Sequence, residues 1–399
     1  MNQIRSLAGA IRRFLPIVPL ALAGFAGNAS VMAGARVIAW GAGTVVNPSN
    51  PNDRGQSIIP VNLTNVAQVA GGWWHTVVLK TNGTLQAWGD NSFEQTNCPA
   101  GSNFVAIACG DWHTAALQSD GTVQAWGDTY YGAVSVPSNL SNVVAVACGF
   151  YHCLALKSDG TLAAWGAVNP GDGSDVDFGQ GRVPNDLSNV VAIAAGGYHN
   201  LVLKSDGTLI AWGQNNYGET NVPFGLSNAV AIAAGGYHNL AMLTNGTIKA
   251  WGNDADGETD VPASVSNVVA MAGGLAHSVV LRTNGTVVAW GLNTENDITV
   301  PAGLSNVVQV AAGDYHTLAL ARTNPPLAWS ALLQAGRATN GFTVTVPTQN
   351  GRVYQLQYTS ALTNRVWQPL PLHAGTGANV ILTDTNFTAS QRFYRVMRW

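Results

Sequence analysis

The sequence predicts an all-β fold: a seven-bladed β-propeller closed by pairing of its N- and C-terminal strands, followed by a small β-sandwich. A histidine and a tryptophan-glycine pair alternate along the chain, and each of the first six histidines precedes the next tryptophan by 13 residues. Successive histidines lie 38, 39, 47, 39, 39 and 39 residues apart, a period typical of repeat architectures. The repeated residues are His75, His113, His152, His199, His238, His277 and His316, with Trp40, Trp88, Trp126, Trp165, Trp212, Trp251 and Trp290.

Residues 1–35 have the three parts of a secretory signal, which are a basic start, an apolar run and a small-residue processing site. These parts are Arg5, Arg12 and Arg13, then Phe14–Gly27, then Ala33 and Ala35. We therefore expect a secreted or cell-surface protein. Nothing later in the chain is long and apolar enough to span a membrane.

Removal of residues 1–35 takes away three arginines and no acid, leaving 15 Lys+Arg and 21 Asp+Glu and a net charge of −6. Nucleic acid rewards clustered Lys and Arg, so this balance argues against it as a partner. We expect a monomer.

The unit that begins at Ala229 illustrates one blade of three to four strands. Residues 229–234 alternate as an inner strand, 239–243 form a second and 248–251 a third. Asn245-Gly246 between the last two is a strong hairpin signal. A short outer segment follows at 257–262.

The two ends of the repeat region are each incomplete. Arg36–Trp40 supplies only a last strand, and Val307–Leu320 supplies inner strands without a following tryptophan. Pairing them would complete a seventh blade and remove two exposed sheet edges. The propeller is thus predicted over residues 36–323.

The repeated tryptophans are predicted to be core residues, and the repeated histidines to be structural groups that satisfy the backbone. The rival interpretation of the histidines is a metal or general-base site. The sequence contains no G-x-S-x-G, Walker or H-E-x-x-H motif. We therefore expect no enzyme activity, no catalytic residue, no cofactor and no metal.

The unit G-x-[YW]-H-x-x-x-L-x-x-[ND]-G-T-[LVI]-x-A-W-G resembles the repeat of the regulator of chromosome condensation family, a seven-bladed propeller. The tail Asn216-Tyr-Gly-Glu-Thr-Asn-Val-Pro223 is similar to that of a bacterial secreted branch that includes the propeller-type inhibitor of β-lactamases. The longer G-Q-L-G-x-G tail of nuclear members is absent, so nucleotide exchange on a nuclear GTPase is not implied. In the inhibitor, aromatic residues of two loops bind the partner.

The segment before each histidine and the loop after each Trp-Gly should share one face, because the chain turns back at each hairpin. Aromatic residues gather in both places and are the usual anchors of binding surfaces. The predicted partner-binding residues are Trp73, Trp74, Trp112, Phe150, Tyr151, Tyr198, Tyr237 and Tyr315 before the histidines, and Phe93, Tyr131 and Tyr217 after the tryptophans. Ala276, Asp256 and Glu295 break the pattern. Two extended loops, Gly41–Gln56 and Gly166–Arg182, belong to the same face.

Two acidic loops raise the alternative of Ca²⁺ binding, although solvated turn carboxylates are the simpler interpretation. They contain Asp172, Asp175 and Asp177, and Asp254, Asp256 and Glu258. The cysteines are Cys98, Cys109, Cys148 and Cys153; Cys109 and Cys148 replace a repeat alanine, which favours buried free thiols. Whether the cysteines pair is left open.

After a linker at 324–326, strands are predicted at Gly341–Val346, Arg352–Thr359, Val366–Leu370, Asn379–Thr383 and Gln391–Val396. Residues 324–399 should form a β-sandwich that serves attachment, sorting or support. The leading hypothesis is an exported, non-enzymatic propeller that binds an extracellular or surface protein through its aromatic face. The alternatives are a carbohydrate-binding or carbohydrate-active secreted protein and a cell-surface structural repeat protein.

Overall fold

The computed structural model describes residues 35–45, 49–167, 176–322, 334–338, 341–349, 352–360, 367–376, 378–385 and 392–398. All regular elements of these residues are β-strands, which confirms the all-β prediction. No helix among them could cross a membrane. Of the predicted signal, only Ala35 is described.

Six sheets of the repeat region are antiparallel trios of consecutive strands, which we number sheets 1 to 6. They are β2 (Val66–Gly71), β3 (His75–Lys80) and β4 (Leu85–Gly89); β5 (Phe104–Cys109), β6 (His113–Gln118) and β7 (Val123–Gly127); β8 (Val143–Cys148), β9 (His152–Lys157) and β10 (Leu162–Gly166); β11 (Val190–Ala195), β12 (His199–Lys204) and β13 (Leu209–Gly213); β14 (Ala229–Ala234), β15 (His238–Leu243) and β16 (Ile248–Gly252); and β17 (Val268–Gly273), β18 (His277–Arg282) and β19 (Val287–Gly291). Each described sheet has three strands, and the segment 257–262 forms turns rather than a fourth strand.

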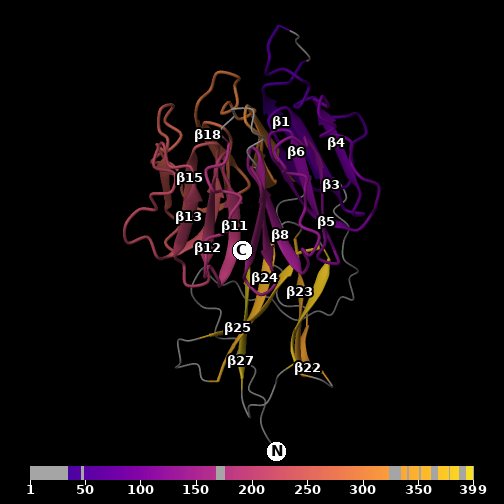
Figure 1. Cartoon of the computed structure of the whole chain (residues 1–399), viewed down its shortest axis with the longest axis vertical. Helices are drawn as coiled ribbons and strands as arrows, with labels where there is room; N and C mark the ends of the chain where they lie inside the picture. Colours follow the sequence, from indigo (N-terminus) through magenta and orange to yellow (C-terminus); the bar gives the residue numbers. More distant parts are fainter. Residues whose placement is uncertain are drawn as a thin grey trace, which may run out of the picture. The chain divides into compact units, whose positions relative to one another are not determined.

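Sheet 7 joins the two ends of the repeat region (Figure 1). It consists of β20 (Val307–Ala312), β21 (His316–Arg322) and the N-terminal strand β1 (Ala35–Gly41). β1 lies antiparallel to β21, with Ala35 opposite Arg322 and Gly41 opposite His316. The N-terminal strand therefore takes the place that the third strand has in the other sheets.

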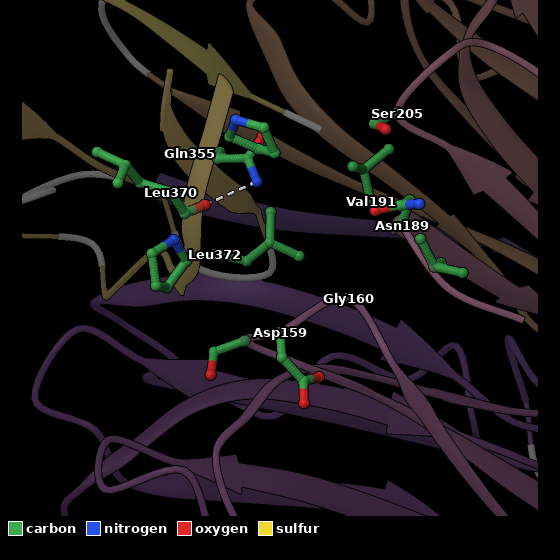
Figure 2. Close-up of a pocket in the computed structure, with 12 residues that line it drawn as sticks. Asp159, Gly160, Asn189, Val191, Ser205, Gln355, Leu370 and Leu372 are labelled. Carbon is green, nitrogen blue, oxygen red and sulfur yellow. Dashed lines mark hydrogen bonds between the residues drawn. The ribbon is translucent and has the colours of Figure 1, made fainter. Parts of the chain in front are cut away.

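Local sequence explains the hairpin between the second and third strands. In the turn of sheet 3, the Asp159 carboxylate accepts a hydrogen bond from the Thr161 backbone N–H at 2.9 Å, and Gly160 has a φ of +80°. This is a left-handed conformation that glycine adopts without strain. Both turn residues are labelled in Figure 2.

Buried residues of the strands join neighbouring sheets. Val279 of sheet 6 and Val310 of sheet 7 belong to one apolar cluster that includes Trp40. Leu320 of sheet 7 and Val66 of sheet 1 belong to another. Sheet 7 thus packs on both the sixth and the first sheet, and apolar burial on both sides is the main stabilising term.

The C-terminal residues form two further three-stranded antiparallel sheets. Their strands are β22 (Gln334–Ala338), β23 (Gly341–Pro347) and β26 (Asn379–Asp384), and β25 (Gln368–Ala374), β24 (Val353–Thr359) and β27 (Phe393–Arg398). Val344 and Leu382 of one sheet and Leu356 of the other share an apolar cluster. The Gln355 amide donates to the Leu370 carbonyl at 2.8 Å (Figure 2).

Candidate functional site

Each repeated histidine is hydrogen-bonded to the next sheet through its Nε2 atom. The partner is the residue directly after the next histidine, which we call the relay residue. The pairs are His75–Thr114 (3.0 Å), His113–Cys153 (3.2 Å), His152–Asn200 (2.9 Å), His199–Asn239 (3.0 Å), His238–Ser278 (2.9 Å), His277–Thr317 (3.0 Å) and His316–Thr76 (3.0 Å). The sequence predicted backbone partners; the structure corrects this, because the partners are side chains of the neighbouring sheet.

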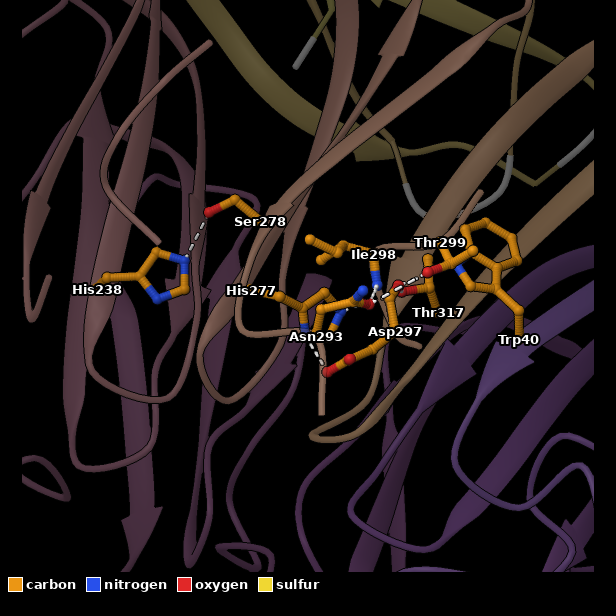
Figure 3. A network of polar contacts seen from close by, with 9 residues as sticks. All are labelled: Trp40, His238, His277, Ser278, Asn293, Asp297, Ile298, Thr299 and Thr317. Carbon is orange, nitrogen blue, oxygen red and sulfur yellow. Dashed lines mark hydrogen bonds and ion pairs between the residues drawn. The ribbon is translucent and has the colours of Figure 1, made fainter. Parts of the chain in front are cut away.

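Relay residues also donate a hydrogen bond to a backbone carbonyl of a loop (Figure 3). The Ser278 hydroxyl donates to the Glu258 carbonyl at 2.9 Å. The Thr317 hydroxyl donates to the Asp297 carbonyl at 2.8 Å, and Figure 3 labels both residues. Since these two hydroxyls use their hydrogens in this way, Nε2 of His238 and Nε2 of His277 must carry a proton and donate. The Asp297 carbonyl also accepts from the Trp40 indole at 2.9 Å.

Burial keeps these histidines neutral. It lowers the pKa of His75, His152, His238 and His316 to about 3. It lowers the pKa of His199 and His277 to about 4. All six rings are fully buried, so a substrate cannot reach them for general-base catalysis.

The Asp297 carboxylate lies 3.6 Å from Nδ1 of His277. Burial raises the pKa of this carboxyl to about 6 while it lowers that of His277. At neutral pH His277 is therefore uncharged while Asp297 is ionised. Because only one of the two groups is charged, their contact is not an ion pair.

The tryptophans divide by exposure. Trp40, Trp165, Trp251 and Trp290 are buried, whereas Trp88, Trp126 and Trp212 are half-buried. Six indoles donate to loop carbonyls: Trp40, Trp88, Trp126, Trp165, Trp251 and Trp290. The Trp212 indole nitrogen has no partner among the described residues.

The loop before each sheet presents one side chain outward, and in most repeats a buried Gln or Glu two residues later holds it. The Tyr217 backbone N–H donates to the Glu219 carboxylate at 2.8 Å, and the Phe93 N–H donates to the Gln95 amide oxygen at 2.9 Å. Glu219 and Gln95 are fully buried. The presented residues are Arg54, Phe93, Tyr131, Phe178, Tyr217, Asp256 and Glu295.

Aromatic rings from both kinds of loop form a continuous cluster across sheets 1 to 5, which we call the aromatic arc. Its members are Trp73, Trp74, Phe93, Trp112, Tyr131, Phe150, Tyr151, Phe178, Tyr198, Tyr217 and Tyr237, in ring contact at 4.3–6.3 Å. Tyr315, also predicted for this set, does not join these contacts among the described residues.

The sequence missed two members of this surface. Phe178 packs edge-on against Tyr198 at 5.4 Å, and Tyr130 packs edge-on against Tyr131 at 5.0 Å. Counting five residues from the tryptophan overlooked Phe178 because its loop is extended. The motif Phe178-Gly-Gln matches Tyr217-Gly-Glu and could have identified it.

The arc is partly open to solvent. Tyr217 is 54% exposed and Phe93 42%, and Tyr130, which packs on the arc at Tyr131, is 53% exposed. The indole nitrogens of Trp73, Trp74 and Trp112 are buried and have no hydrogen-bond partner among the described residues. Partly exposed aromatic side chains are typical of binding surfaces.

A polar cavity of about 160 Å³ lies where the inner strands end, lined by residues of all seven sheets. Asp111 and Asp314 line it. Burial, followed by the negative charge of Asp314, raises the pKa of Asp111 well above its usual value, and burial raises that of Asp314 to about 7. Burial, followed by the proximity of Asp314 and Asp111, raises the pKa of the Tyr315 phenol.

Cys109 and Cys148 also line this cavity. Both are only partly buried, which corrects the prediction of buried thiols. They remain partly accessible because the inner strands end at the cavity. Cys153 is buried and Cys98 is partly exposed.

Three carboxylates of the acidic loops make contacts within their own loops. Asp177 pairs with Arg182, and Glu258 accepts from the Asn253 amide at 2.6 Å. Asp254 accepts from the Thr259 backbone at 3.0 Å. Asp172 and Asp175 lie outside the described residues. These bonds fit carboxylates that stabilise turns.

A family model for the regulator of chromosome condensation (RCC1) repeat matches residues 66–95, 104–133, 143–173, 190–219, 229–258 and 268–296. The chain belongs to the RCC1 repeat family. The six matched segments begin at the inner strands of sheets 1 to 6. No curated protein matches the chain.

Solved structures resemble this RCC1-repeat chain in fold. Prp20p from Saccharomyces cerevisiae is 20% identical, with a TM-score of 0.58 over 73% of this chain and 92% of that one. Human WBSCR16 is 20% identical, with a TM-score of 0.53 over 73% and 99%. The ACR4 receptor kinase ectodomain of Arabidopsis thaliana is 22% identical, with a TM-score of 0.50 over 65% and 91%. At these identities the likeness concerns the fold alone.

Proposed function

We propose that this RCC1-repeat chain is an exported, non-enzymatic propeller whose seven sheets close into a ring and which binds a protein partner through the aromatic arc. Ring closure is supported by the hydrogen bond from His316 to Thr76, which joins the last sheet to the first. The histidines and tryptophans serve this ring. The basic and apolar N-terminal residues support export.

The observation that carries the binding role is the continuity of the arc. Five successive sheets each bring an outward loop residue against the residue before the histidine, from Arg54 over Trp74 at 5.4 Å to Tyr217 on Tyr237 at 5.6 Å. Core packing alone does not require this on an exposed face. Rigid aromatic side chains held in place lose little entropy on binding.

The test is affinity capture from an extracellular extract with the chain lacking residues 1–35. Trp74→Ala, Trp112→Ala and Tyr151→Ala together should abolish retention of the partner while the thermal transition stays cooperative. A matched control changes Ile210→Ala and Lys249→Ala, two exposed residues on third strands away from the arc. Capture that survives in the triple variant would refute the site.

A second candidate is glycan binding, favoured by the parallel stack of Trp73 on Trp74 at 4.5 Å and on Trp112 at 5.3 Å. A glycan array, with turnover assays for carbohydrate-active enzymes, distinguishes it: sugar binding lost in the same triple variant would favour this reading. A narrower form of the protein-binding proposal is inhibition of a β-lactamase, which an enzyme panel tests directly.

A further inference from the structure

Sheet 3 departs from the repeat at two positions. Its relay residue is Cys153, where the other sheets have Thr, Asn or Ser. Its inner strand ends in Cys148, at the position that Cys109 occupies in sheet 2 and that Ala195 and Ala234 occupy in sheets 4 and 5. Among the described sheets, sheet 3 alone has a cysteine at both positions.

The two cysteines face each other. Cys148 of β8 is directly opposite Cys153 of β9 in the antiparallel register, and their Sγ atoms are 2.7 Å apart. Directly opposite residues in such a pair have Cα atoms about 4.5–5.5 Å apart, within the range that a disulfide spans. The register of the two residues is therefore compatible with a disulfide.

The other two cysteines have no such arrangement. Cys109 lies opposite Thr114, and its sulfur is 3.9 Å from the threonine hydroxyl. Cys98 lies outside the strands. The geometry therefore selects one pair.

We propose that Cys148 and Cys153 form a disulfide in the mature protein, and that this bond fixes the loop 149–152, which carries Phe150 and Tyr151 of the aromatic arc. The bond itself is independent of the function proposed above. Its consequence for binding rests on that function.

The loop occupies the middle of the arc. Phe150 packs edge-on against Tyr198 at 5.2 Å, and Tyr151 contacts Trp112 at 5.6 Å and Tyr131 at 4.3 Å. A covalent link between the residues that flank this loop would limit its motion. Holding aromatic anchors in their bound positions reduces the entropy lost on binding.

The bond forms by thiol–disulfide exchange with an oxidant of the disulfide class, such as oxidised glutathione. One thiolate attacks a sulfur of the oxidant and releases the first thiol; the second thiolate attacks the resulting mixed disulfide and releases the other thiol. The two cysteine protons go to solvent and to the released thiolates. Burial raises the pKa of the Cys148 thiol, so we expect exchange before the blade closes.

A metal is the competing use of these residues, because Nε2 of His113 lies 3.2 Å from the Cys153 sulfur and the three ligand atoms cluster. Two thiolates on a tetrahedral Zn²⁺ with bonds of about 2.3 Å would stand nearly 4 Å apart. The observed separation of 2.7 Å is closer to a bond than to that spacing. The geometry favours the disulfide.

The experiment counts thiols by alkylation in denaturant and intact-mass spectrometry, on full-length protein exported by its host and purified without reductant. Two alkyl groups are expected without reductant and four after reduction. The variant Cys148→Ser should take three without reductant, because its former partner is released. The variant Cys98→Ser should take one.

The control variant Cys148→Ala with Cys153→Ser restores the residue types that other sheets carry, so it should fold and take two alkyl groups with or without reductant. Four reactive thiols in the unreduced wild type would overturn the proposal. So would stoichiometric Zn²⁺ or copper by elemental analysis, or fewer than three alkyl groups on the unreduced Cys148→Ser variant.

Hydrogen exchange of residues 149–152 tests the consequence. A reductant should speed exchange there in the wild type and leave the control variant unchanged. Equal rates with and without reductant would refute the stiffening of the loop even if the bond is present. Neither readout needs a partner, so failure here and failure of the binding proposal are separate results.

Discussion

Sheets 1 to 5 and sheets 6 and 7 share one scaffold but present different surfaces. In sheet 5, Tyr217 from the preceding loop packs on Tyr237 at 5.6 Å. The equivalent residues of sheet 6 are Asp256 and Ala276. In sheet 7, the loop residue Glu295 instead accepts hydrogen bonds from amides of the extended loop. The buried positions follow the repeat in all seven sheets. The exposed loop positions differ between sheets 1 to 5 and sheets 6 and 7.

The largest effect should be unfolding in acid, which should destabilise sheets 1 to 5 and sheets 6 and 7 alike. Each of six histidines has a folded pKa of about 3 or 4, below the unfolded value of about 6.5. Their stabilisation is complete above pH 6.5 and is lost as pH falls toward 4. At about 1.4 kcal/mol per pH unit and site, the loss exceeds the 5–15 kcal/mol typical of a domain.

Chemical denaturation from pH 8 to pH 4 measures this loss. His238→Gln should reduce the number of protons taken up on unfolding by one. A stability that stays constant down to pH 4 would show that the histidines are not buried and neutral.

The next effect separates scaffold from surface. Trp290→Ala in sheet 6 removes a buried indole that donates to the Glu258 carbonyl, and should cost about 3–5 kcal/mol. Trp112→Ala, in the partly exposed arc, should cost less stability but weaken partner binding by 2 kcal/mol or more, about 30-fold. Urea titration and binding to the captured partner measure both; the reverse pattern would contradict the distinction.

A smaller effect of opposite sign is expected in the central cavity. The folded pKa of Asp314, about 7, exceeds the unfolded value of about 3.9. This carboxyl therefore stabilises the fold when protonated, and that contribution is lost as pH rises through 7. Asp314→Asn should add about 1–2 kcal/mol at pH 8 and little at pH 4. Thermal melts at both pH values decide this, and a loss at pH 8 would contradict it.

The fold was predictable because its signals are local and repeated. The Asp159-Gly160 turn follows from residues adjacent in sequence, and the 13-residue spacing from histidine to tryptophan sets the length of each hairpin. The strand β22 (Gln334–Ala338) was missed because its sequence, Gln-Ala-Gly-Arg-Ala, lacks alternation.

The site was predictable only in part. Its aromatic residue types are visible in the sequence, but their contacts depend on loop lengths: Phe178 reaches Tyr198 across an extended loop that breaks the residue count. The partner of each histidine lies on the next sheet, 39–48 residues away in six pairs and 240 residues away in the pair His316–Thr76, and no local pattern shows it. The facing of Cys148 and Cys153 likewise depends on strand register.

The most direct test of the account is photo-crosslinking with benzoylphenylalanine placed at Tyr217 or at Phe224. Both aromatic residues are exposed and lie seven residues apart, but only Tyr217 belongs to the arc. With the captured partner, crosslinks should form from position 217 and not from 224. Crosslinks from 224 alone would contradict the assignment of the aromatic arc as the binding surface.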